Sequence, residues 1–249
     1  MGLRTLRRAF LIVCAGVVVA AMVAVMPATA TAGGLQLTVT PKVAAAQAAS
    51  TKLYVYPPTA HPYGHTYSAW EVRWVQWWVG VPAPQNPVTD VTGAYCAEGQ
   101  SGPVWYLASD MGENSVRNCT VPAGEAILIS PDLYECSTAE GDGNTFATLS
   151  RCATSGMDDA TQADVTVDGV HLTHLLTRYR FKTSLFTFKY PAVNVMNVSG
   201  PGVTKSAADG VIFMLAPLAA GRHTLDLRFA FKAPVSIAGE VTYHLTVLG

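Results

Sequence analysis

The stretch from Ser68 to Val79, SAWEVRWVQWWV, holds four of the five tryptophans and constrains the fold more than any other part of the chain. At 100° per residue, the spacing of an α-helix, these four indoles fall within an arc of about 100°. They are Trp70, Trp74, Trp77 and Trp78. In a strand, the adjacent Trp77 and Trp78 would point to opposite faces. The sequence therefore predicts a helix with one wide aromatic face.

Both ends of this helix carry sequence signals. Ser68 and Glu71 have the spacing of a capping box, which predicts the helix start at Ser68 and a capping role for Glu71. Gly80, followed by Pro82 and Pro84, ends the helical pattern. The sequence thus predicts a helix of about three turns.

Two roles fit the aromatic face. Large aromatic side chains dominate protein cores, so we expect the helix to pack its indoles against a sheet. The alternative is an exposed platform for a sugar or another flat ligand, made by Trp70, Trp74 and Trp78 with Glu71 beside them. The accessibility of the indoles separates the two.

The N-terminal segment has the pattern of a secretory signal. Arg4, Arg7 and Arg8 precede an uncharged apolar run from 9 to 26, and small residues follow at 28–32. We expect residues 1–32 to be a signal peptide that is cleaved after Ala32, so that the protein is secreted or extracytoplasmic. An uncleaved anchor is the alternative, and only then is a membrane a partner.

Residues 33–52 are rich in Ala, Thr and Val, which predicts a flexible leader. The length of the remaining segment, 53–249, suits a single domain.

Charge limits the possible partners. The formal net charge of the full sequence is −1, and loss of the three signal arginines makes it −4. No basic patch stands out, which argues against nucleic acid as a partner. Charged residues make up 13% of the chain, about half the usual share. The surface is therefore expected to be rich in small and neutral polar side chains.

Cysteine usage agrees with export. Cys14 leaves with the signal, and the four cysteines that remain argue for two disulfides. Of the three possible pairings we favour the two local ones, because each closes a short excursion of the chain. They are Cys96–Cys119 and Cys136–Cys152. A zinc site made by all four is the alternative, but no two of them have the spacing of a zinc knuckle.

Short apolar or alternating segments fill most of the remaining chain. Segments 104–108, 126–129 and 211–215 predict strands buried on both faces. We expect a hairpin at residues 110–114, joining 104–108 to 116–121, a second hairpin at Asp168-Gly169, and a short helix over 157–163. The fold class is therefore predicted to be mainly β, an antiparallel β-sandwich that is Ig-like or jelly-roll-like, with the one Trp-rich helix packed against it.

Several motifs resemble a group of exported bacterial proteins of uncharacterised function. They include WEVRWVQWWVGVP, NPVTDVTG, CAEGQSGPVWYLA and CTVPAGEAILIS from residues 70–130, and VDGV, ADGVIFMLAPL and GRHTLDL later in the chain. The resemblance implies export and a β-rich domain, and it transfers no catalytic residue. The pattern from Leu218 to Leu225 is also similar to a turn and strand of immunoglobulin-like domains, which indicates fold only.

Residues with catalytic or metal-binding chemistry are sparse. The chain has no G-x-S-x-G or H-E-x-x-H motif, no P-loop and no dinucleotide fingerprint. We interpret His171, His174, His223 and His244 as structural. Asp158 and Asp159, with Asp132 or Asp142, have the chemistry of a calcium site, although a solvated loop is the simpler interpretation.

The sequence thus favours a non-enzymatic binding or cell-envelope-associated module. We predict no catalytic, cofactor-binding or metal-binding residue and no cofactor, and the partner is unknown, with carbohydrate or an envelope component as candidates. The alternative is a carbohydrate-active hydrolase that uses carboxylates beside the Trp helix, since glycosidases pair two carboxyls with aromatic side chains.

Overall fold

The computed structural model describes residues 53–199 and 202–249. The described residues belong to one compact unit, Ala48–Gly249. The predicted signal peptide, residues 1–32, and the predicted leader, residues 33–52, lie outside the described residues. Within the described part, no helix combines the length and the apolarity that a membrane crossing requires.

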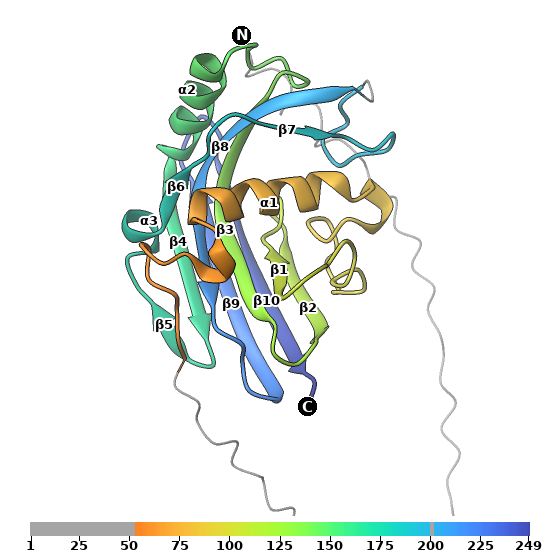
Figure 1. The fold of residues 1–249 in the computed structure, drawn as a ribbon, viewed down its shortest axis with the longest axis vertical. Coiled ribbons are helices and arrows are strands. Elements are labelled where there is room, and N and C mark those ends of the chain that lie inside the picture. The colour runs from red at the N-terminus through yellow and green to blue at the C-terminus, as the bar shows by residue number, and fades with distance from the viewer. Residues whose placement is uncertain (1–52, 200–201) are drawn as a thin grey trace, which may run out of the picture. The chain divides into compact units, whose positions relative to one another are not determined.

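Two five-stranded sheets pack face to face, which confirms the β-sandwich (Figure 1). The first contains β1 (Val104–Ala108), β3 (Ala126–Ser137), β8 (Val203–Leu215) and β6 (Arg180–Lys182) in that order, and β7 (Phe186–Lys189) also pairs with β8. The second runs in the order β2 (Asn114–Val121), β10 (Ile237–Val247), β9 (Gly221–Phe231), β4 (Ala160–Val167), β5 (Val170–Leu172).

The sheets are mixed rather than purely antiparallel. β1 pairs with β3 in parallel, and β2 pairs with β10 in parallel. The predicted hairpin between 104–108 and 116–121 is therefore wrong, because β1 and β2 lie in different sheets. Asp110 stabilises the turn between them by accepting hydrogen bonds from the backbone N–H groups of Gly112 and Glu113 and from the Ser115 hydroxyl. The turn residues at 110–114 thus correctly predicted a turn of the chain, but they did not predict which strand pairs with β1 or β2.

The Asp168-Gly169 hairpin is confirmed. β4 and β5 pair in antiparallel fashion with Val167 opposite Val170. Asp168 has φ 49° and Gly169 has φ 81°, the positive values that a tight two-residue turn requires. The strongest local turn signal of the sequence therefore also gave the correct pairing.

Three α-helices occur in the described residues, where the sequence predicted one Trp-rich helix and a short one. They are α1 (Tyr67–Gly80), α2 (Phe146–Met157) and α3 (Leu175–Arg178). The short helix predicted over 157–163 is wrong, because α2 ends at Met157 and β4 begins at Ala160. A capping box between Thr145 and Thr148 begins α2.

The core has two layers, one on each face of the first sheet. α1 crosses β3 and β8 on one face, and β9 and β10 of the second sheet lie behind (Figure 1). The segment 207–215 of β8 is accordingly buried throughout. Pro131 interrupts β3 at the irregularity between Ile129 and Asp132, where a residue without a backbone N–H is tolerated.

Two disulfides join neighbouring parts of the chain, with the pairing favoured from the sequence. Cys96–Cys119 links the loop after α1 to β2, and Cys136–Cys152 links β3 to α2. Paired cysteines are typical of an oxidising, extracytoplasmic compartment.

Candidate ligand-binding groove

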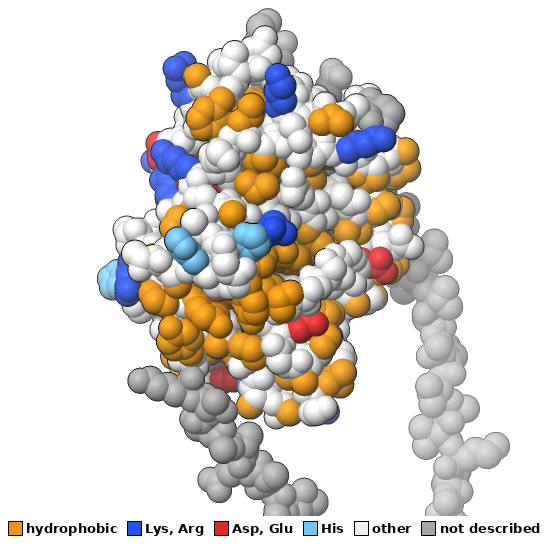
Figure 2. Space-filling view, in the orientation of Figure 1, with side chains coloured by type: hydrophobic (Ala, Val, Ile, Leu, Met, Phe, Trp, Pro, Cys, Tyr) orange, Lys and Arg blue, Asp and Glu red, His pale blue; other side chains and the backbone are white. Residues whose placement is uncertain are grey.

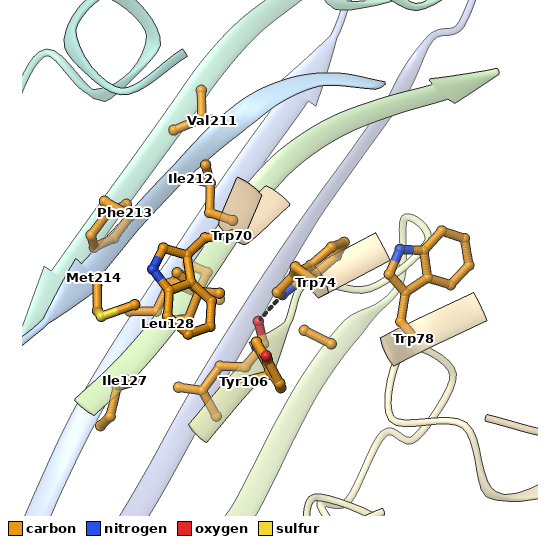
Figure 3. Close-up of a cluster of buried hydrophobic side chains, with 14 of the residues drawn as sticks. Trp70, Trp74, Trp78, Tyr106, Ile127, Leu128, Val211, Ile212, Phe213 and Met214 are labelled. Carbon is orange, nitrogen blue, oxygen red and sulfur yellow. Dashed lines mark hydrogen bonds between the residues drawn. The ribbon is translucent and has the colours of Figure 1, made fainter. Parts of the chain in front are cut away.

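The Trp helix is a packing element. The exposed fractions of Trp70, Trp74, Trp77 and Trp78 are 4%, 3%, 7% and 7%. Figure 3 shows Trp70 close to Leu128 and Met214, and Trp74 donating from Nε1 to a backbone oxygen, which is that of Leu107 at 3.2 Å. Rings covered in this way cannot form an open sugar platform, so the packing role expected from the sequence holds and the platform of Trp70, Trp74, Trp78 and Glu71 does not form.

Glu71 does not cap the helix as predicted. Thr66 is the N-cap, and its hydroxyl accepts a hydrogen bond from the Ala69 N–H at 3.2 Å. Glu71 therefore lies one turn into the helix, on its buried face and fully covered. The helical spacing of the sequence already indicated this buried position. At 100° per residue from Trp70, Glu71 falls at about 100°, between Trp78 and Val75.

The Glu71 carboxyl lies against the first sheet with no hydrogen-bond partner for either oxygen. It approaches β8 at Gly210, where a Cβ would come within 3.1 Å of Oε1. Burial raises its pKa well above 4.5, the nearby Asp209 charge raises it further, and Arg180 opposes the shift. Burial therefore favours the protonated, neutral form of this carboxyl over the charged one.

Arg180, which is partly exposed, forms an ion pair with the buried Asp209 next to Glu71. Arg180 donates from Nε and Nη2 to the two oxygens of Asp209, both at 2.7 Å, and from Nη2 to Asp158 at 2.8 Å. Lys182 lies farther away, with Nζ 3.7 Å from Asp209, and its side chain is 55% exposed. Arg180 makes the short contacts with Asp209, whereas Lys182 pairs with it only at the longer distance and is more than half exposed, so a ligand in the groove can also approach the Lys182 ammonium.

A groove of about 670 Å³ lies between α1 and the segment that carries β6 and β7. Its lining comes from both sides and comprises His65, Thr66, Ser68, Ala69, Val72, Arg73 and Gln76, with Lys182, Ser184 and Phe186. Figure 2, in the view of Figure 1, shows histidine and basic side chains close together on this face. Two permanent cations, one histidine and no carboxyl line the groove, so it favours negatively charged groups.

Fixed contacts hold the two walls of the groove together. Gln76 donates from Nε2 to the Thr187 carbonyl at 2.9 Å and so ties α1 to β7. The Arg73 guanidinium stacks over the Trp70 ring at 5.6 Å and lies 3.1 Å from His65 Nε2. The buried indole thus orients a cation on the exposed side of the helix.

A second hollow lies along the exposed side of α2. Its lining residues, from Phe146 to Asp158, come from that helix and its C-cap. All of these side chains come from one helix and its C-cap, whereas the groove takes its lining from two segments that face each other, so the groove is the better candidate site.

The histidines are not brought together into a site. His223 Nδ1 lies 2.6 Å from Asp168, and Nε2 lies 2.8 Å from the Ala219 carbonyl, so its ring is used within the fold. His171 faces Asp164 at 3.6 Å. On the last two strands Leu245, rather than His244, lies opposite His223.

The aspartates considered for calcium do not form that site. Asp158 pairs with Arg180, and Asp159 pairs with Lys232 at 3.6 Å. Asp132 is fully buried, and burial raises its pKa well above the ordinary value. Asp142 lies within 4.8 Å of the sulfur atoms of Cys136 and Cys152, but the disulfide makes these sulfurs unavailable to a metal.

Comparisons with known proteins assign no family. No family model and no curated protein matches the chain. Similar solved structures include PbICP-C in complex with falcipain-2, with 13% identity, a TM-score of 0.26, and coverage of 59% of this chain and 99% of that one. A cysteine protease inhibitor of Entamoeba histolytica has 11% identity, a TM-score of 0.21, and coverage of 54% and 96%. Amebosin has 14% identity, a TM-score of 0.17, and coverage of 54% and 96%. TM-scores below 0.5 are no basis for an activity.

Proposed function

We propose that this chain is a secreted, non-enzymatic binding module whose groove between α1 and β6–β7 takes a ligand that carries phosphate, sulfate or carboxylate groups. One observation carries this proposal. Arg73 and Lys182 converge with His65 on a groove that no carboxyl lines, in a chain whose net charge is negative. A local positive site on a negative molecule attracts anions selectively and not through overall charge.

The hydroxyl and amide groups of the groove complement its cations. Thr66, Ser68 and Ser184 offer hydroxyls, and Thr66 and Ser68 belong to the start of α1, where the helix dipole favours negative charge. Phe186 and Val72 add apolar surface to the lining of the groove. This mixture suits an acidic glycan, which is in line with the carbohydrate or envelope component expected from the sequence.

A hydrolase is the weaker candidate. Glycoside hydrolysis needs two carboxyls on either side of the scissile bond. Glu71 is fully buried on the inner face of the helix, and none of the residues that line the groove has a carboxyl. Export is supported by the two disulfides and the signal pattern, and we further propose membership of the exported bacterial group that the motifs resemble.

Binding to dextran sulfate, with uncharged dextran of the same length as the comparison, tests the proposal. We expect calorimetry to detect binding to dextran sulfate alone, weakening as salt screens the charges. The double variant Arg73→Gln/Lys182→Gln is expected to bind at least about tenfold more weakly, a change of about 1.4 kcal/mol.

Arg222→Gln is the matched control, because this arginine is exposed on β9, away from the groove. Equal binding by the double variant and the wild type would remove the groove from consideration. Equal binding of both dextrans would show that charge does not select the ligand.

A further inference from the structure

The end of β3 and the turn after it gather three carboxyl groups away from the groove. Ser137 donates from its hydroxyl to Glu140 at 2.8 Å and from its N–H to Asp142 at 3.1 Å. The Ser206 hydroxyl of β8 donates to Glu135. All three carboxyl side chains are partly buried. The turn thus holds Glu140 and Asp142 beside the strand that carries Glu135.

These carboxyls have no basic partner. The ion pairs of the described residues include Asp209, Asp158 and Asp159, but none includes Glu135, Glu140 or Asp142. Asp209, by contrast, is neutralised by Arg180 and Lys182, whereas here three acids lie together without a cation.

Tyr190 is an independent indication that something binds here. Its side chain is 1% exposed, and its hydroxyl has no hydrogen-bond partner. Burial raises its pKa, and the charges of Glu135 and Glu140 raise it further, which places the hydroxyl close to these two carboxyls. A buried hydroxyl without a partner costs free energy unless a ligand or water satisfies it.

The geometry points to a calcium site: we propose that Glu135 and Glu140, with the Tyr190 hydroxyl and water, bind Ca²⁺ and that Asp142 adds negative charge beside it. All the donors are oxygen atoms, which are the ligands that Ca²⁺ prefers. The bound ion would connect β3, the turn, and the segment that follows β7. Extracellular calcium modules bind with Kd of about 10⁻⁴–10⁻³ M, an affinity that suits a site with two direct carboxylates.

Thermal unfolding of the purified protein in CaCl₂ and in EDTA tests this site. At about 10 mM CaCl₂ we expect the wild-type Tm to rise by about 2–5 °C, because the ion binds only the folded chain. MgCl₂ at the same concentration controls for ionic strength, and calorimetry with CaCl₂ measures the Kd directly. The double variant Glu135→Gln/Glu140→Gln is expected to lose the calcium response.

Two further variants keep the test decisive. Glu113→Gln, at an exposed position outside the cluster, is expected to respond like the wild type. Tyr190→Phe keeps the ring and is expected to weaken calcium binding several-fold. A wild type whose Tm and calorimetry are indifferent to CaCl₂ would overturn the proposal, as would a calcium response that survives in the double variant or is matched by MgCl₂. If the double variant does not fold, the wild-type calorimetry and Tyr190→Phe decide the question.

Discussion

At the scale of single residues, Arg117 and Glu71 are both buried without an ion-pair partner, and the fold tolerates them in opposite ways. The Arg117 guanidinium donates to the Ala108 carbonyl at 3.0 Å, to the Val88 carbonyl at 3.1 Å and to the Tyr243 hydroxyl at 2.7 Å. Arginine cannot lose its proton in a protein, so only such contacts make its burial tolerable. Glu71 has no such contacts, and burial raises its pKa, which favours its neutral form.

The raised pKa of Glu71 predicts a specific pH dependence of stability. A carboxyl whose pKa is higher in the folded state than its unfolded value of 4.5 binds its proton more tightly in the folded state. Its contribution to the free energy of unfolding is therefore fully present below pH 4.5. Between pH 4.5 and the folded-state pKa, this contribution falls by about 1.4 kcal/mol for each pH unit. We therefore expect Glu71→Gln to gain stability relative to the wild type as the pH rises from 5 to 8.

Urea unfolding at several pH values measures this difference. The comparison with Glu71→Gln isolates Glu71 from the other buried carboxyls, which remain in both proteins. Glu98→Gln, at an exposed position, is expected to keep the wild-type slope. A pH slope that is unchanged by Glu71→Gln would mean that this carboxyl is not neutral in the folded protein.

At the scale of elements, the buried face of α1 is fixed by packing and hydrogen bonds, and its N-cap residue sets where the helix begins. Tyr67, at its first position, donates from its hydroxyl to the Tyr56 carbonyl at 2.8 Å and accepts from the Met214 N–H at 3.2 Å. Three indoles donate to backbone carbonyls, including Trp77 to Glu98 at 2.9 Å. These contacts fix the rotation of the helix and therefore which residues face the groove.

The position of the helix start predicts a contrast between two neighbouring hydroxyls. Thr66→Ala removes the N-cap acceptor and is expected to lower the free energy of unfolding by about 1 kcal/mol. Ser68→Ala is expected to change it by less than about 0.5 kcal/mol, because Ser68 lies inside the first turn. Urea unfolding of the two variants checks this, and a larger loss from Ser68→Ala would restore the capping box expected from the sequence.

Sequence periodicity was informative where the pattern is local. Periodicity gave the Trp helix, and other local signals gave the Asp168-Gly169 turn and the two disulfide pairs, each of which closes within a short stretch of chain. It missed the parallel pairing of β2 with β10, because Val116 and Thr242 are far apart in sequence and nothing local marks them as partners. It also missed Glu71, whose apparent capping spacing hid its place within the apolar arc.

The groove was beyond sequence analysis for the same reason. Arg73 and Lys182 come from α1 and β6, and only the fold brings them to one surface. Neither residue belongs to a motif or a basic run. The negative net charge further hid a positive site, because a sum over the chain gives no information about where charges gather.

At the scale of the whole molecule, the sandwich supplies a rigid body and α1 supplies one wall of the site. The first sheet is covered by α1 on one face and by the second sheet on the other, so β1 and the segment 207–215 of β8 are buried throughout. Sites on such supported elements hold their geometry before a ligand arrives. The groove is therefore expected to bind without rearrangement of the sheets.

Mapping the amide chemical shifts of the protein during titration with a short dextran sulfate oligosaccharide tests the central claim most directly. We expect the largest changes on the groove, at Thr66, Ser68, Gln76 and Ser184, and we expect them to disappear in Arg73→Gln/Lys182→Gln. Changes centred on the hollow along α2, or changes spread evenly over the surface, would contradict it.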